Sequence, residues 1–151
     1  MKRLREIMRE GFLFAVRQDA TVTEAARTMT ENNVGIVAVL EEDRLIGVFS
    51  ERDIVRRVID KGLDPAATVV EQVMTRDLVV ASEQEDYQTA MRTMDQANIR
   101  HLPVVRGTQV ISMLSIRDLM RVDMKRMGEE LRFLHEYLYT VPPDVIEPKG
   151  S

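Results

Sequence analysis

The sequence predicts a mixed α/β (α+β) fold, in which two similar β-α-β-β-α halves pack about a pseudo-twofold axis and a C-terminal amphipathic helix follows. An internal repeat carries this prediction, because the Ser-x-Arg-Asp pattern at residues 50–53 recurs 65 residues later at residues 115–118. The unit is longer than a solenoid repeat and occurs only twice, which favours two facing halves. An apolar fraction of 44% in 151 residues supports a packed interior.

Composition and charge exclude several classes of protein. The net charge is −4 and no long basic run occurs, so generic binding to nucleic acid has little electrostatic support. The absence of cysteine excludes disulfides and thiolate metal sites and fits a reducing compartment. No stretch approaches the roughly 20 apolar residues of a membrane span. We therefore expect a soluble, cytoplasmic protein that binds neither nucleic acid nor membrane.

In the first unit, the clearest local signal is a helix start at Thr21, with Glu24 placed three residues later as the partner of a capping box. Apolar residues then follow helical spacing until Asn32 and Asn33 end the helix. The remaining predicted elements are a strand at 34–40, a strand at 45–49, and a helix from Ser50 to about Asp60 that Lys61 and Gly62 break.

The second unit repeats this order. The predicted elements are a strand at 78–81, a helix at 86–96, strands at 101–105 and 110–114, and a helix that starts near Ser115. The segment at 69–74 also resembles residues 4–8 at an offset of 66, so the lead-in is duplicated too. We expect one unit at 4–68 and the other at 69–122.

Beyond the repeats, a helix over 123–140 and a flexible tail at 141–151 are expected. Three- and four-residue spacing defines an apolar stripe along this helix, composed of Met120, Met124, Met127, Leu131, Leu134 and Leu138. Such a stripe needs a partner surface, either on its own domain or on the same helix of a second subunit. The sequence therefore favours a homodimer, and the polar face is not basic enough for a membrane-surface helix.

The duplicated motif admits two interpretations. Ser50 and Asp53, like Ser115 and Asp118, can simply cap a helix and complement its positive end. The same geometry also suits a nucleotide, with phosphate at the helix N-terminus and carboxylate on the ribose hydroxyls. Capping does not require the arginines, and both copies carry one, at Arg52 and Arg117.

Arg100 and His101 place two potential cations where a strand begins, and they have either a structural or a phosphate-facing role. The first unit has Gly35 and Ile36 at these places, so the two clefts are expected to differ in affinity. Catalytic signals are sparse: the chain has two histidines, no cysteine, no Gly-rich phosphate loop and no spaced histidine pair for a metal. We expect no enzyme and no metal site.

Residues 47–54, 99–105 and 114–119 together resemble a tandem pair of CBS (cystathionine-β-synthase) domains, also called a Bateman module. The resemblance extends from about Leu4 to Arg121 and is greatest to small stand-alone CBS-pair proteins of prokaryotes. It implies two clefts for adenosine-containing ligands such as AMP, ADP, ATP, NAD or S-adenosylmethionine, with no other cofactor required.

The resemblance also implies composite clefts. One cleft would combine Ser115, Arg117 and Asp118 with Val34 and Gly35, and His101 would lie near the phosphates. The other would combine Ser50, Arg52, Asp53, Ile99 and Arg100. Ser112 stands where the first unit has Gly47, and the start at 82–86 lacks the family's usual proline, so some distortion of the second unit is expected.

Two functions follow as hypotheses. The first is a regulatory adenine-nucleotide sensor that acts on a protein target by a ligand-dependent shift between conformations. The alternative is a structural dimerisation module whose clefts hold no physiological nucleotide.

Overall fold

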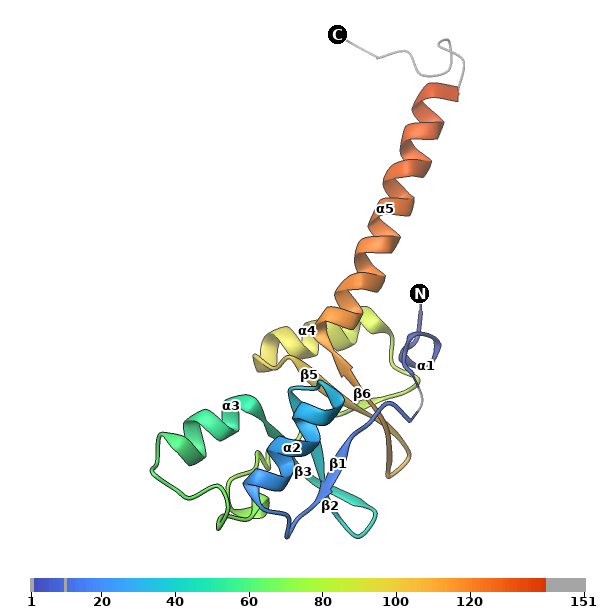
Figure 1. Ribbon diagram of the computed structural model, residues 1–151. Helices are drawn as coiled ribbons and strands as arrows, with labels where there is room; N and C mark the ends of the chain where they lie inside the picture. The colour runs from blue at the N-terminus through green and yellow to red at the C-terminus, as the bar shows by residue number, and fades with distance from the viewer. Residues whose placement is uncertain (1, 10, 141–151) are drawn as a thin grey trace.

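The computed structural model describes residues 2–9 and 11–140, and it contains two three-stranded sheets with helices packed on them (Figure 1). The strand orders are β1-β2-β3 and β4-β5-β6, and each sheet has one parallel and one antiparallel pair. The predicted fold class, with its duplicated halves and long C-terminal helix, is confirmed.

The elements are as follows: α1 Leu4–Ile7, β1 Ala15–Arg17, α2 Val22–Asn32, β2 Ile36–Glu41, β3 Arg44–Ser50, α3 Glu51–Asp53, the π-helix Ile54–Ile59, a 3₁₀ turn Val70–Gln72, β4 Ala81–Ser82, α4 Tyr87–Ala97, β5 His101–Arg106, β6 Gln109–Ser115 and α5 Ile116–Thr140.

The two halves match in detail. In both, a bulge interrupts the antiparallel pair at the same repeat position, between Val39 and Leu40 and between Val104 and Val105. Ser112 is buried, and its hydroxyl donates to the Arg9 carbonyl at 2.9 Å. The expected distortion is therefore not seen in the pairing of β5 with β6, because the hydroxyl finds a backbone acceptor.

The capping box predicted for the first helix and its end at Asn33 are confirmed, and the second helix has corresponding caps that were not predicted. Thr21 and Glu24 form the capping box of α2, and Asp86 caps α4 by accepting from the Thr89 amide at 2.9 Å. Asn33 and Asn98 end the two helices in the left-handed conformation, at φ 52° and 53°. Asparagine tolerates this conformation better than most residues. The helices thus present the same apolar faces to their sheets.

The strand expected at 78–81 was placed too early. β4 comprises Ala81–Ser82, and it pairs with β5 only through Ala81–Val104 and Ser82–Val105. The apolar run 78–81 suggested a longer strand, but the parallel ladder with β5 begins only at its last residue.

The duplicated lead-in segments are exchanged between the halves. Leu4 is fully buried in the core of the second half, and Val70 is fully buried in the core of the first. Matching backbone hydrogen bonds of 2.8 Å hold them, from Leu4 to the Glu85 carbonyl and from Val70 to the Ala20 carbonyl. The halves therefore interlock, and the boundaries 4–68 and 69–122 stay a prediction about the sequence repeat.

The last helices of the two halves end differently. In the first half the helix passes into the π-helix Ile54–Ile59, and Gly62 follows it at φ 70°. The equivalent position in the second half is Met127, which cannot take that conformation easily. As a result α5 continues for 25 residues and projects away from the sheets (Figure 1). The tail at 141–151 lies outside the described residues.

We predict that Gly47→Ala destabilises the fold by about 1–3 kcal/mol. A Cβ at Gly47 would lie 2.5 Å from the Met74 sulfur and 2.9 Å from the Thr75 carbonyl oxygen, so the segment at 74–75 must move. Urea unfolding measures the change, with Gly128→Ala as the control. A Cβ at Gly128 meets no atom within 4 Å, so that helical substitution should be neutral or stabilising. Equal stability of Gly47→Ala and wild type would contradict the close packing.

Candidate functional site: a cleft between the two halves

A cavity of about 700 Å³ lies at the junction of the two halves. Five segments contribute: the residues before β1, the turn between α2 and β2, the start of β5, the end of β6 and the first turns of α5. The lining residues are Phe12, Leu13, Phe14, Asn33, Val34, Gly35, Ile36, Arg100, His101, Met113, Ser115, Ile116, Arg117, Asp118, Met120, Arg121 and Met124. This volume falls within the usual range for small-molecule sites.

The start of α5 forms one wall of the cavity. The Ser115 hydroxyl accepts from the Asp118 amide at 3.1 Å, and Asp118 Oδ2 accepts from the Ser115 amide at 3.0 Å. The Ile116 amide donates to the Arg100 carbonyl at 2.8 Å, which ties this helix start to β5. Asp118 Oδ1 forms no hydrogen bond with the residues that the structure describes. One acceptor atom thus stays available beside the cavity.

Three guanidinium groups line the same cavity as this acceptor. Arg100, Arg117 and Arg121 line the cavity and are exposed, and within residues 2–9 and 11–140 none of them forms an ion pair or a side-chain hydrogen bond. Arginine pairs with phosphate in a bidentate manner. The rim therefore favours an anionic ligand.

His101 lies partly buried at the start of β5, between these charges. Burial lowers the pKa of His101; the Asp118 carboxylate acts against this shift, the Arg100 guanidinium adds to it, and the Glu51 carboxylate opposes it. The imidazole is consequently neutral near pH 7 in the free protein, and it offers one donor and one acceptor to the cavity.

Part of the cavity lining is apolar. The Phe12 and Phe14 rings lie edge to face, with centroids 5.6 Å apart, and the Arg9 guanidinium covers Phe12 at 5.1 Å from the ring centroid. Val34 and Met113 add aliphatic surface to the same lining. The cavity therefore combines apolar surface, which suits a flat aromatic group, with positive charge, which suits an anion.

The equivalent motif in the first half is engaged differently. Asp53 is only 7% exposed; its Oδ2 accepts from the Ser50 amide at 3.0 Å, and the Thr75 hydroxyl lies 3.2 Å from Oδ1. Arg57 Nε lies 3.5 Å from Oδ1, and Nη1 of the same guanidinium donates to the Met74 carbonyl at 2.8 Å. Both oxygens of Asp53 thus have partners within the chain.

The structure brings together all six residues predicted for one cleft. Ser115, Arg117, Asp118, Val34, Gly35 and His101 all line the cavity, and Arg100, predicted for the other cleft, lines it as well. Ser50, Arg52 and Asp53 lie at the start of α3, and Ile99 packs against the core of the second half. Their roles in binding stay predictions.

Sequence reasoning missed the apolar part of the lining. Phe12 and Phe14 precede the first regular strand, and Met120 and Met124 belong to the stripe that was assigned to pairing. The charged lining residue Arg121 was missed as well. The only available signal for the first pair was the clustering of two of the four phenylalanines.

The described part of the chain contains no group of three or more histidine, aspartate or glutamate side chains that could hold a metal ion. Within the same residues, no helix is long and apolar enough to cross a membrane.

Comparison with known proteins agrees with this architecture. The CBS domain matches the chain twice, at residues 4–60 and 70–125, so the chain belongs to the CBS domain family. A relative from Arabidopsis thaliana, "CBS domain-containing protein CBSX3, mitochondrial", is 34% identical over 125 residues, which are 80% of this chain and 61% of that protein. YhcV of Bacillus subtilis is 34% identical over 104 residues, which are 69% of this chain and 74% of that protein.

The chain spans 61%, 66% and 45% of the length of the first three curated relatives it matches. Among solved structures, the CBS domain protein NE2398 superposes with a TM-score of 0.75 at 26% identity, covering 82% of this chain and 98% of that one. The CBS domain pair of MJ0100, solved with 5′-methylthioadenosine and S-adenosyl-L-methionine, has a TM-score of 0.74, covers 83% of this chain and 98% of that one, and shares the fold at 20% identity. CBS pairs are in general regulatory ligand-binding modules.

We predict that Asp53→Ala destabilises the chain by about 2–4 kcal/mol, because Thr75 and Arg57 lose a buried charged acceptor. Asp118→Ala should cost only about 1 kcal/mol, the value of a helix cap. Chemical unfolding of both variants measures the difference. Equal losses of unfolding free energy in the two variants would contradict the difference in hydrogen bonding between Asp53 and Asp118.

A second prediction concerns pH. Because folding lowers the pKa of His101 below its ordinary value of 6.5, the unfolded chain binds the proton more readily, and the free energy of unfolding falls as pH decreases below about 6.5. His101→Gln should flatten this part of the profile, whereas a variant of the exposed His135, His135→Gln, should keep it. A wild-type slope in His101→Gln would rule out this origin of the pH dependence.

Proposed function

We propose that the chain is a regulatory module that binds one adenine nucleotide in the cleft at Ser115 and Asp118 and transmits its occupancy to a protein partner. The observation that carries this proposal is a cavity that combines an apolar lining with three guanidinium groups and one carboxylate oxygen, which have no side-chain partner among residues 2–9 and 11–140.

Each part of the cavity has a role in the proposal. Asp118 Oδ1 accepts from the ribose hydroxyls, while Oδ2 keeps its bond to the Ser115 amide. The phosphate lies at the N-terminus of α5, near the Ser115 hydroxyl and Arg117. Adenine packs against the apolar surface that includes Val34 and Phe12.

The charges select among adenosine compounds. Three guanidinium groups attract the phosphates of AMP, ADP, ATP or NAD, and they repel the sulfonium cation of S-adenosylmethionine. At Asp53 both oxygens are already bonded to the chain. We therefore propose one nucleotide per chain, where the duplicated motif suggested two.

The action is regulatory and not catalytic. The ligand contacts β5, α5 and the turn at Val34, which belong to different halves, so it favours whichever arrangement of the halves gives the better fit. A difference in affinity between two arrangements sets the size of the shift. A cytoplasmic homodimer, expected from the sequence, belongs to the same proposal.

A structural dimerisation module is the second candidate. The internally bonded Asp53 favours it, since that carboxylate acts as a cap and a packing group. The two functions differ in their response to nucleotide.

We predict that AMP, ADP or ATP raises the melting temperature of the chain, with a stabilisation of about 2.7 kcal/mol at 100 times the Kd. S-adenosylmethionine and adenosine should give smaller shifts. Arg117→Ala should weaken nucleotide binding by about tenfold or more, because it removes a charge-assisted contact. Differential scanning fluorimetry and titration calorimetry measure both effects.

The matched control is Arg52→Ala, which changes the repeat-equivalent arginine outside the cavity and should leave affinity unchanged. A loss of binding in Arg52→Ala but not in Arg117→Ala would place the ligand in the other cleft. The absence of any shift with all three nucleotides would favour the dimerisation module.

A further inference from the structure

The outer part of α5 has no packing partner within the described chain. Every residue from Met127 to Tyr139 is exposed, and Figure 1 shows this part of the helix extending beyond the sheets. An isolated helix of this length is marginal in water, and most helical stability in proteins comes from packing of an apolar face. A second surface is therefore needed to stabilise it.

The exposed face has the spacing of a two-stranded coiled coil. Its six apolar residues alternate steps of four and three, which places Met124, Leu131 and Leu138 at heptad position a and Met120, Met127 and Leu134 at position d. All six are exposed, and none is charged. A strict 3.5-residue period favours a left-handed supercoil with a second helix of the same kind.

The flanking polar residues favour a second copy in parallel orientation. Glu130 occupies position g and His135 the following position e, so in a parallel pair each Glu130 carboxylate lies opposite the imidazole of the other helix, which can donate a hydrogen bond to it, while it keeps its bond from Arg126. An antiparallel pair would instead bring the two Glu130 side chains together. A membrane surface is a poorer match, because Glu129, Glu130 and Glu136 interrupt the basic residues of the polar face.

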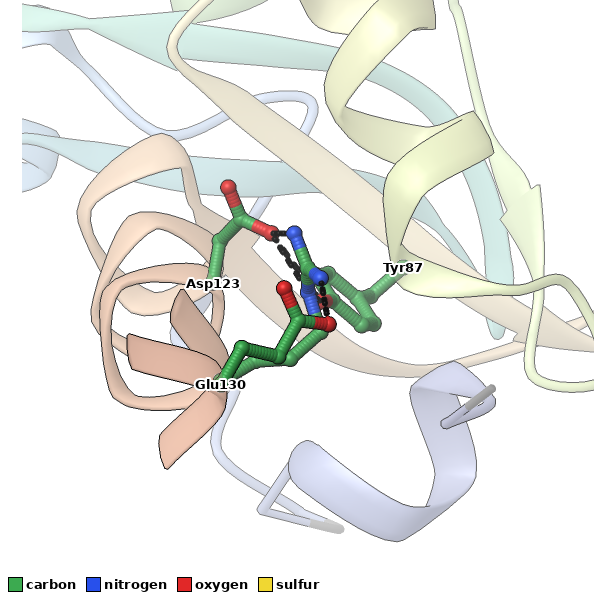
Figure 2. A network of polar contacts seen from close by, with 4 residues as sticks. Tyr87, Asp123 and Glu130 are labelled. Carbon is green, nitrogen blue, oxygen red and sulfur yellow. Dashed lines mark hydrogen bonds and ion pairs between the residues drawn. The ribbon is translucent and has the colours of Figure 1, made fainter. Parts of the chain in front are cut away.

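A polar cluster fixes how α5 leaves the body (Figure 2). Tyr87 of α4 is 1% exposed, and its hydroxyl donates to Asp123 Oδ1 at 3.0 Å. Arg126 Nε donates to the Tyr87 oxygen at 2.9 Å, and Arg126 Nη1 donates to Glu130 Oε1 at 2.6 Å. The first turns of the helix are thus fastened to the second half, which sets the direction in which the stripe faces.

The stripe begins inside the candidate site. Met120 and Met124 line the cavity and also form the first two layers of the stripe, where they are 48% and 67% exposed. A ligand in the cavity and a second helix on the stripe would therefore contact the same two side chains. Flexible methionines transmit such a change by repacking.

We propose that two copies pair through α5 in a parallel coiled coil, and that pairing and occupancy of the cleft are linked through Met120 and Met124. The pairing stands independently of the proposed function, whereas the linkage rests on it. By reciprocity, the factor by which pairing changes nucleotide affinity equals the factor by which nucleotide changes pairing.

Sedimentation velocity of the full chain tests the pairing, with Leu131→Glu as the disrupting variant and Phe133→Glu as the matched control. The two residues are 67% and 68% exposed, but Phe133 lies at position c, away from the seam. Leu131→Glu should weaken dimerisation by about 100-fold, since two glutamates would face each other at a layer of the seam. A monomeric wild type, or equal effects of the two substitutions, would overturn the proposal.

Orientation is tested by Leu138→Cys, which introduces the only thiol in a chain without cysteine. Mild oxidation should give a covalent dimer, because position a side chains meet their counterparts only in a parallel, in-register pair. A noncovalent dimer that does not cross-link would exclude this orientation.

Titration calorimetry of ATP against wild type, Leu131→Glu and Phe133→Glu tests the linkage. The monomeric variant should bind ATP with an affinity changed by about fivefold or more, while Phe133→Glu keeps the wild-type affinity. Equal affinities in all three would overturn the linkage. If no form binds ATP, ADP or AMP, the proposed function and the linkage both fail, while the sedimentation result still decides the pairing.

Discussion

Each Ser-x-x-Asp motif has one carboxylate with two oxygens, and capping a helix uses only one of them. In both halves Oδ2 accepts from the serine amide, so the helix starts are built alike. The other oxygen makes the difference. Thr75 and Arg57 contact it in Asp53, whereas in Asp118 it has no hydrogen-bond partner in the described part of the chain and lies beside a cavity that three arginines line. A duplicated structural device thereby yields a packed cap in one half and a candidate site in the other.

The same divergence extends to the helices that follow these caps. In the first half, Val22 and Val58 are buried in the core, and the helix ends shortly before Gly62. In the second half the equivalent residues are Tyr87 and Asp123, whose hydrogen bond fastens α5 to α4 and lets it continue outward. One helix therefore carries the candidate phosphate-binding groups at its start and an apolar stripe beyond it. In the proposed function, that continuity would connect the cleft to a partner.

The sequence predicted the fold and a group of residues that line one cavity, because its strongest signals are local. Thr21 with Glu24, and Ser115 with Asp118, cap helices through bonds that span three residues, so spacing alone reveals them. The hydrogen bond between Thr75 and Asp53 could not be predicted from the sequence. Thr75 lies 22 residues away and reaches Asp53 only because the lead-in segment packs on the first half. The sequence also did not reveal that Phe12 and Phe14 line the cavity. They lie in a loop that crosses to the opposite half, and no periodicity marks such a loop. The early placement of β4 shows that an apolar run does not define where a parallel ladder begins.

A crystal structure of the chain grown with AMP would show whether the second oxygen of Asp118 holds a ligand. Nucleotide density is expected only in the cavity at the start of α5, with both ribose hydroxyls donating to Asp118 and the phosphate beside Ser115 and Arg117. Nucleotide bound at Asp53 instead, with the Thr75 hydroxyl displaced, would contradict this expectation, as would an empty cavity at saturating AMP.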